Sequence, residues 1–255
     1  MGQLTSAVRP GSAARPGSAW RPVGAVVATA LAVMLLGGCG GAKHGDTLPA
    51  LGSAATVAPP AAPGLTDSAA LQSRLLTAGD LPAGFTRLDD GTPGNGPVPE
   101  DHSRTEPAAC ARVLAPVGDQ VPGASARGAV HYATPEFDSI DIDVASYPNG
   151  GAAQAFSVVQ SLLRDCGRYD GTDADGTAVH YLLGGLDQPA AGDAAASFQV
   201  RTTSQGMTLY SVATVAVVGS SVVQIADTAP KPIEPAVLHD LTTKQVNRLQ
   251  GVAGP

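Results

Sequence analysis

The sequence predicts an α+β fold, in which a mainly antiparallel sheet is flanked by helices within a single domain spanning residues 65–252. Three observations carry this prediction. Apolar and acidic residues alternate from Ile140 onwards, which is typical of a strand. Several further strand-like stretches follow one another across short turns. Amphipathic helical patterns precede, interrupt and follow these strands.

The domain is predicted to begin with a helix that extends from Thr66 or Asp67 to about Leu76. Either of the first two side chains can accept a hydrogen bond from the free amides of a helix N-terminus. The apolar stripe of this helix consists of Leu71, Leu75 and Leu76. A turn at residues 79–85 follows it.

Residues 89–106 are predicted to form a loop, because three glycines and three prolines interrupt any regular element there. A short helical turn is expected at residues 110–114. The first clear strand starts at Ile140, and it directs its apolar side chains to one face and Asp141 and Asp143 to the other.

The clearest helical pattern starts after Asn149. Its inward positions recur at spacings of four, three, four and three residues: Ala152, Phe156, Val159, Leu163 and Cys166. This pattern places Cys166 on the buried stripe near the end of the helix. Gly167 follows, a residue type suited to a helix C-terminus.

The second half of the chain predicts a meander of strands and a closing helix. The expected strands are residues 178–183, 194–203, 207–218 and 221–227. Turns of two or three residues separate the last three strands, which favours antiparallel hairpins. The closing helix runs from about Pro235 to Gln250, and proline suits its first turn.

Signatures of several common enzyme classes are absent from the sequence. No G-x-S-x-G nucleophile elbow, no H-E-x-x-H zinc motif and no S-x-x-K pair occurs. The five histidines lie far apart: His44, His102, His131, His180 and His239. We therefore expect a protein that is not an enzyme, with no catalytic residues and no cofactor, and the sequence assigns no ligand-binding residue.

Two acidic patterns have a cation-binding interpretation and a structural one. Asp141 and Asp143 could bind a cation together, but polar residues also alternate on a solvated sheet face, which is the interpretation we favour. Asp173 to Gly176 has the start of a calcium loop, but Leu182 stands where that loop needs a glutamate. A plain turn is expected there, and no metal site is predicted.

The chain contains three cysteines, and two of them are predicted to form a disulfide. Cys110 and Cys166 form an even pair, which favours a bridge in an oxidising compartment. The bridge would close a loop of about 57 residues, worth roughly 4 kcal/mol in the chain-entropy model. The alternative is two free thiols that are buried separately.

Residues 1–38 have the pattern of a lipoprotein signal peptide. They contain three arginines and no acidic residue, and the apolar run at 23–36 is 14 residues long. A membrane-spanning helix needs roughly 20 apolar residues. Two glycines and Cys39 follow, which resembles the bacterial lipobox and predicts Cys39 as the lipidation site. The alternative is an uncleaved signal anchor with a chance cysteine.

Residues 39–64 are predicted to contain the lipidated cysteine and a flexible tether. Small, apolar and turn-forming residues dominate there, without a helical or strand period. The 24 residues after Cys39 would average about 27 Å end to end and could extend to roughly 80 Å. Two acyl chains anchor a protein stably. The predicted location is therefore the extracytoplasmic face of the cell membrane.

The charge of the chain bears on its partners. Without residues 1–38, 12 basic residues remain against 22 acidic ones, so the net charge is −10. An acidic chain repels nucleic acid and anionic lipid headgroups. We therefore expect no nucleic-acid partner, and a membrane contact that depends on the lipid. The chain is also rich in Ala, Gly and Pro, a composition that is common in actinobacterial proteins.

Four features together resemble a known family. They are the Asp-Leu-Pro-Ala-Gly-Phe run at 80–85, Cys110, the Ala152, Phe156 and Cys166 spacing, and the Gly192-Asp193 turn into the meander. Residues 68–250 resemble the PknH-like extracellular sensor domain of mycobacteria and their relatives, which occurs on receptor kinases and in free lipoproteins. The resemblance implies an antiparallel sheet flanked by helices, with a cleft for an envelope ligand. Members usually carry two disulfides, whereas only one pair is available here. Actinobacterial lipoproteins with a PsbP-like fold share the same plan.

These expectations favour a non-catalytic binding or sensor module in the cell envelope, whose partner is a small molecule or a protein. The alternative is a carrier of a lipid or another apolar molecule, which would need an apolar cavity of several hundred Å³. A cell-wall enzyme is a third interpretation, and it would need an acidic pair or a nucleophile in a cleft.

Overall fold

The computed structural model describes residues 47–58, 63–88 and 102–251 of the 255-residue chain. Their strands form one sheet in the order β1-β3-β4-β9-β8-β7-β6-β5-β2, and all neighbours are antiparallel. The strands are β1 (Thr86–Arg87), β2 (Arg104–Glu106), β3 (Ala126–Ala133), β4 (Ser139–Ser146), β5 (Arg168–Thr172), β6 (Ala178–Gly185), β7 (Ala194–Ser204), β8 (Met207–Val218) and β9 (Ser221–Ala229). The helices are α1 (Ser68–Gln72), η1 (Ala78–Asp80), η2 (Ala108–Arg112), α2 (Val117–Gln120), α3 (Gly151–Asp165) and α4 (Pro235–Gln250). The predicted α+β fold is confirmed.

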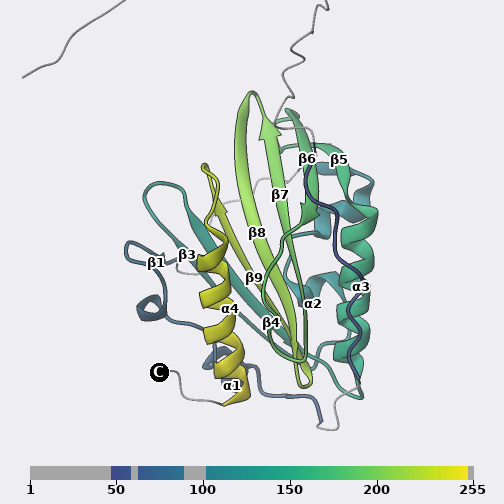
Figure 1. The fold of residues 1–255 in the computed structure, drawn as a ribbon, viewed down its shortest axis with the longest axis vertical. Coiled ribbons are helices and arrows are strands. Elements are labelled where there is room, and N and C mark those ends of the chain that lie inside the picture. The colour runs from purple at the N-terminus through teal and green to yellow at the C-terminus, as the bar shows by residue number, and fades with distance from the viewer. Residues whose placement is uncertain (1–46, 59–62, 89–101, 252–255) are drawn as a thin grey trace, which may run out of the picture. The chain divides into compact units, whose positions relative to one another are not determined.

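Helices cover both faces of the sheet. α1 and α4 pack on one face, whereas α2 and α3 pack on the other (Figure 1). The central strands supply both cores by alternation: on β8, Val215 and Val217 face α3, while Ala216 and Val218 face α4. Because both faces of β8 and β9 are buried, these strands are apolar along most of their length.

The longest helix on the second face packs through the stripe that the sequence predicts. The first four stripe residues of α3 are buried, and Cys166 follows directly after its last residue. Cys166 forms a disulfide with Cys110 of η2, with an S–S distance of 2.03 Å and a Cα–Cα distance of 5.6 Å. The predicted bridge is confirmed, and it fastens η2 to the C-terminal end of α3.

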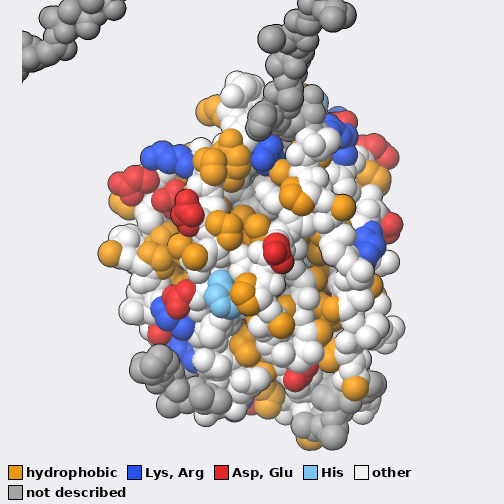
Figure 2. Space-filling view, viewed as in Figure 1, with side chains coloured by type: hydrophobic (Ala, Val, Ile, Leu, Met, Phe, Trp, Pro, Cys, Tyr) orange, Lys and Arg blue, Asp and Glu red, His pale blue; other side chains and the backbone are white. Residues whose placement is uncertain are grey.

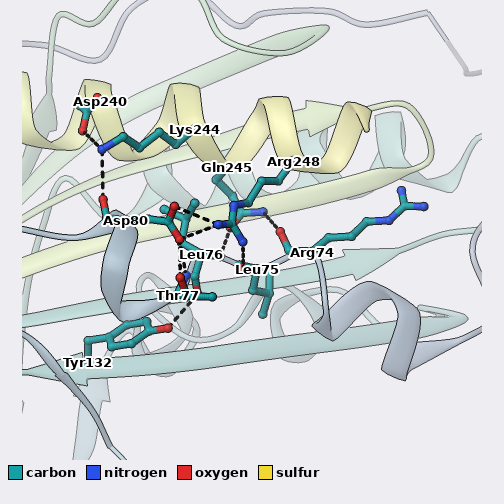
Figure 3. A network of polar contacts seen from close by, with 10 residues as sticks. All are labelled: Arg74, Leu75, Leu76, Thr77, Asp80, Tyr132, Asp240, Lys244, Gln245 and Arg248. Atoms are coloured by element: carbon teal, nitrogen blue, oxygen red, sulfur yellow. Dashed lines mark hydrogen bonds and ion pairs between the residues drawn. The ribbon is translucent and has the colours of Figure 1, made fainter. Parts of the chain in front are cut away.

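On the opposite face, α4 holds the irregular segment 74–80 in place (Figure 3). Arg248 donates hydrogen bonds to both carboxylate oxygens of Asp80, at 2.7 and 2.9 Å. Gln245 accepts a bond from the amide of Leu76 and donates one to the carbonyl of Arg74. Burial alone would raise the pKa of Asp80, but hydrogen bonds from Thr77 and the Arg248 guanidinium bring it below its ordinary value.

This network explains why the first helix is shorter than expected. Asp67 caps its N-terminus as predicted, by accepting bonds from two backbone amides, but α1 ends at Gln72 instead of about Leu76. The carbonyls of Leu75 and Leu76 accept bonds from Arg248 and Tyr132, and the Leu76 amide bonds to Gln245. Side chains from elsewhere in the fold therefore satisfy the backbone groups that a longer helix would have paired.

The sequence prediction contains no strand at the positions of three short strands, β1, β2 and β5. The predicted loop at 89–106 ends in β2, and residues 89–101 lie outside the described part of the chain. β1 and β2 contain only two and three residues and form the two edges of the sheet. Such lengths are too short for alternation to show.

Residues 47–58, which we call the strap, lie along the fold where the sequence predicts a flexible tether. The backbone N–H and C=O of Ala55 both bond to the side chain of Gln160 on α3, at 2.8 and 2.9 Å. The carbonyl of Pro49 accepts a bond from the amide of Gly185 at 2.7 Å. The apolar side chains packed against the core are Leu51, Ala55 and Val57. The tether prediction is therefore wrong for the strap, whereas 39–46 and 59–62 lie outside the described residues.

A glycine pair at the end of β6 makes room for the strap. A Cβ atom on Gly185 would collide with the carbonyl of Ala50, and one on Gly184 would collide with Leu48. The strap can lie directly on the sheet only because these two positions have no side chain.

We expect Gly185→Ala to displace the strap, because its methyl group would need the space of the Ala50 carbonyl. The substitution should destabilise the fold by about 1–3 kcal/mol, as overpacking does. It should also speed hydrogen exchange at the Ala55 amide, measured by NMR or mass spectrometry. Gly167→Ala is the matched control, since its Cβ would have no neighbour within 4 Å. Unchanged exchange at Ala55 in Gly185→Ala would show that the strap is not held at this point.

Candidate functional site

A recess of about 210 Å³ opens between the β2–η2 segment and strands β5 to β7. We call it the tyrosine pocket. Its apolar lining consists of Cys110, Ala111, Leu114 and Val200, and its hydroxyl-bearing lining consists of Ser103, Thr105, Tyr169, Thr172, Tyr181 and Thr202. Arg104 is the one charged residue in this lining of described residues. The pocket therefore combines an apolar floor with many hydroxyl groups and one cation.

The pairing of β5 with β6 positions the two tyrosines. Tyr169 and Tyr181 are direct cross-strand partners, so their side chains rise from the same face of the sheet. Their rings stack with centroids 4.4 Å apart and an interplanar angle of 7°. Stacking of this kind contributes about 0.5–1.5 kcal/mol beyond the burial of area, and it restrains both rings.

Two further features build the wall opposite the tyrosines. The disulfide holds Cys110, and with it η2, over the sheet. Gly171 of β5 allows β2 to approach, because a Cβ there would collide with the carbonyl of Arg104. The wall therefore depends on one covalent bond and one missing side chain.

The two phenols in the pocket are neutral groups with spare hydrogen-bonding capacity. Burial raises the pKa of Tyr169 and of Tyr181, so both stay protonated at neutral pH. Within the residues that the structure describes, neither hydroxyl has a hydrogen-bond partner, and the same holds for Thr172 and Thr202. Each free hydroxyl can donate one bond and accept two. These four hydroxyls can therefore bind a polar ligand without breaking a hydrogen bond between described residues.

A second recess of about 180 Å³ lies beneath the strap and beside α3. Its buried polar group, Gln160, already uses both ends of its amide on Ala55. Arg164 donates to the carbonyls of Gln160 and Gly52. Because these groups bind the strap, this recess offers fewer free donors than the tyrosine pocket.

The structure separates the two acidic residues of β4. Asp141 is half-exposed and lies 2.7 Å from the Nδ1 atom of His131. Asp143 is only 6% exposed, since α2 packs over it, and it accepts a bond from the Val117 amide at 2.6 Å. The prediction of a solvated sheet face is therefore wrong for Asp143. Burial raises its pKa from 3.8 to about 7.

Asp143 belongs to a buried polar network that braces the wall of the tyrosine pocket. The side chain of Gln224 donates to Asp143 and to the carbonyls of Leu114 and Ala115. The side chain of Gln120 also donates to the Ala115 carbonyl, at 2.6 Å. Leu114 lines the pocket, so the network holds the backbone of that wall from below.

The remaining predicted residues have structural surroundings. Asp173 accepts bonds from the amides of Asp175 and Thr177 in the turn between β5 and β6, which confirms a plain turn. His180 pairs with Asp170 across the same strands, at 2.7 Å. Among the described residues, no group of three His, Cys, Asp or Glu side chains is arranged to hold a metal ion.

The predicted lipidation site cannot be placed on this architecture, because Cys39 and His44 lie outside the described residues. In the part of the chain that is described, no helix is long and apolar enough to cross a membrane. On the face shown in Figure 2, acidic and basic side chains are interspersed, with hydrophobic side chains in small groups between them.

The pH dependence of stability should reveal the buried carboxyl of Asp143. Between about pH 4 and pH 7 the unfolded chain releases this proton and the folded chain keeps it, so stability should fall as pH rises through this window. Asp227, whose pKa burial raises to about 6, acts in the same direction. The free energy of unfolding would be measured in urea at pH 5 and at pH 8. We expect it to fall less between these pH values in Asp143→Asn than in the wild type, by on the order of a few kcal/mol.

Asp165→Asn is the control for this measurement, because Asp165 is exposed at the end of α3. It should keep the wild-type dependence on pH. If Asp143→Asn also kept the full dependence, the carboxyl of Asp143 would titrate alike in the folded and unfolded states, against the burial seen here.

No protein-family model matches the sequence, and no curated protein matches it either. Four solved chains match, among them two mycobacterial structures. One is the extracellular domain of PknH from Mycobacterium tuberculosis, with a TM-score of 0.53 and 13% identity over 74% of this chain and 98% of that chain. The other is an uncharacterized protein of Mycobacterium smegmatis, an Rv0999 ortholog, with a TM-score of 0.36 and 15% identity over 68% of this chain and 92% of that chain. The described domain thus has the fold of the PknH extracellular domain, the fold that the sequence resemblance predicts.

Proposed function

We propose that this chain is a lipid-anchored extracytoplasmic protein that binds a small envelope molecule in the tyrosine pocket and does not transform it. The observation that carries the proposal is the pocket itself, a recess of about 210 Å³ with four hydroxyl groups that have no hydrogen-bond partner among the described residues. The fold shared with a domain described as extracellular supports the proposed location.

The chemistry of the pocket favours binding over turnover. Its described lining contains no carboxylate and no imidazole that could act as a general base near neutral pH. The phenols of Tyr169 and Tyr181 are held protonated, because burial raises the pKa of each. A ligand would therefore meet neutral hydrogen-bonding groups and one guanidinium.

The strap supports a position close to the membrane. If Cys39 carries the lipid, Thr47, the first described residue of the strap, is the eighth residue after it. Eight residues reach about 28 Å at most, whereas the fully free tether would reach roughly 80 Å. Docking of the strap would thus keep the domain near the headgroups.

The lipid-carrier alternative has less support. Four recesses on the described surface measure from about 180 to about 460 Å³, and the one of about 460 Å³ is a surface groove beside α1 and β3. A carrier would be expected to bury its ligand in an apolar cavity. The tyrosine pocket is hydroxyl-rich and small, which fits a polar ligand better.

The anchor is tested by substituting Cys39. We expect the wild-type protein expressed in an actinobacterial host to lose residues 1–38, to carry an acyl mass and to enter the detergent phase. Cys39→Ser should lose the acyl mass and appear in the aqueous phase. The double variant Cys110→Ser/Cys166→Ser should keep the anchor. A wild-type protein that retains residues 1–38 or has no acyl mass would contradict the proposal.

Ligand binding is tested by thermal unfolding of the mature protein with fractionated envelope extract. A ligand at 100 times its Kd stabilises the folded state by about 2.7 kcal/mol, so one fraction should raise Tm. The double variant Tyr169→Phe/Tyr181→Phe keeps the stacked rings and should lose most of the shift. Tyr210→Phe, outside the pocket, should keep it. If no fraction raised Tm, or if the double variant responded like the wild type, the proposed site would be wrong.

A further inference from the structure

We infer that the ligand of the tyrosine pocket is a single hydroxyl-rich ring with the chemistry of a monosaccharide unit. This inference rests on the proposed binding function and adds the class of ligand to it. Four properties of the pocket lead to it: its volume, its free hydroxyl groups, the geometry of the stacked rings and the charge of its lining.

The volume of the recess suits a ligand of one ring. The recess measures about 210 Å³. A cavity of about 150 Å³ is known to hold a benzene molecule. One six-membered ring with hydroxyl substituents therefore fits, whereas drug-sized ligands occupy pockets of about 300–1,000 Å³.

The free hydroxyl groups favour a ligand that both donates and accepts hydrogen bonds. Tyr169, Thr172, Tyr181 and Thr202 each offer one donor and two acceptor sites, and none has a side-chain partner among the described residues. A ligand with only carbonyl groups could not donate to the oxygen atoms of these hydroxyls. A ligand with only ammonium groups could not accept bonds from their O–H groups. Sugar hydroxyls can satisfy both.

The stacked rings present these groups in a fixed arrangement. Tyr169 and Tyr181 rise from adjacent strands on one face with nearly parallel rings, so the two phenols lie side by side in the pocket. Two neighbouring hydroxyls on a sugar ring suit such a pair. The apolar side chains of Val200 and Leu114 can contact the C–H groups of the same ring. Since the stack is already rigid, little side-chain entropy is lost on binding.

The charge of the lining excludes a cationic ligand. Arg104 carries the one charge of the described lining, and it forms no ion pair with a described residue. Its guanidinium has five N–H donors, which suit sugar hydroxyls and also tolerate an acidic substituent. With no carboxylate in the described lining to offset it, an amine would be repelled.

The probe for this inference is a panel of simple compounds, titrated into the mature protein and followed by NMR and tyrosine fluorescence. The chain without residues 1–38 has five tyrosines and no tryptophan, so its fluorescence reports on tyrosine alone. The panel contains neutral hexoses and pentoses, an N-acetylhexosamine and a uronic acid. Cyclohexanol, benzoate, inorganic phosphate and choline provide ring, anion and cation controls.

We expect at least one sugar to bind with a Kd on the order of 1 mM. Removing one hydroxyl with Tyr181→Phe should weaken it about fivefold, the effect of about 1 kcal/mol for a neutral hydrogen bond. Thr202→Val should have a similar effect, while Tyr210→Phe should have none. Methyl glycosides and short oligosaccharides compared with the free sugar distinguish a glycan end from a free monosaccharide, and binding of either supports the inference.

Three outcomes would overturn the inference: no sugar binds, sugars bind equally well to Tyr181→Phe and Thr202→Val, or benzoate, phosphate or choline binds more tightly than every sugar. These outcomes are separable from failure of the proposed function. If an envelope fraction raised Tm through the tyrosines while no sugar bound, the binding function would stand and only the ligand class would be wrong.

Discussion

The disulfide between Cys110 and Cys166 is the constraint on which the tyrosine pocket depends. It fastens η2 to the end of α3, and so holds one wall of the pocket opposite the stacked tyrosines of β5 and β6. The chain between the two cysteines includes β3, β4 and α3, so the bridge joins two elements that are 56 residues apart in the sequence. The amide of Gln224 completes the support, because it bonds the backbone carbonyls beside Leu114 from the core side.

Much of the fold could be predicted because its elements are long and periodic. α4 has the predicted bounds Pro235–Gln250, and α3 buries the predicted stripe, since each helix packs on the sheet through one face. Burial of Asp143 could not be predicted, because the alternating pattern of β4 is the same whether α2 covers that face or water does. The strap could not be predicted either, because its contacts are single hydrogen bonds and small apolar side chains without a period.

The candidate site was only partly visible in the sequence. A turn at Asp173–Gly176 places Tyr169 opposite Tyr181, since hairpin partners lie at equal distances from their turn, and that signal could have been used. The opposite wall comes from residues about 60 positions earlier, brought there by the disulfide and by the space at Gly171. Isolated threonines in strands carry no signal of a pocket, because they are common on any half-exposed sheet face.

The central claim is that the bridge creates the pocket, and NMR of the ring protons of Tyr169 and Tyr181 tests it most directly. The ring signals would be recorded with and without a bound ligand, first in the oxidised protein and then after reduction. The account predicts that the ligand shifts both rings in the oxidised protein and much less after reduction, while the signals of β8 and β9 are retained. If the ligand shifted both rings as much after reduction as before it, the wall of the pocket would keep its position without the disulfide. That result would contradict the account.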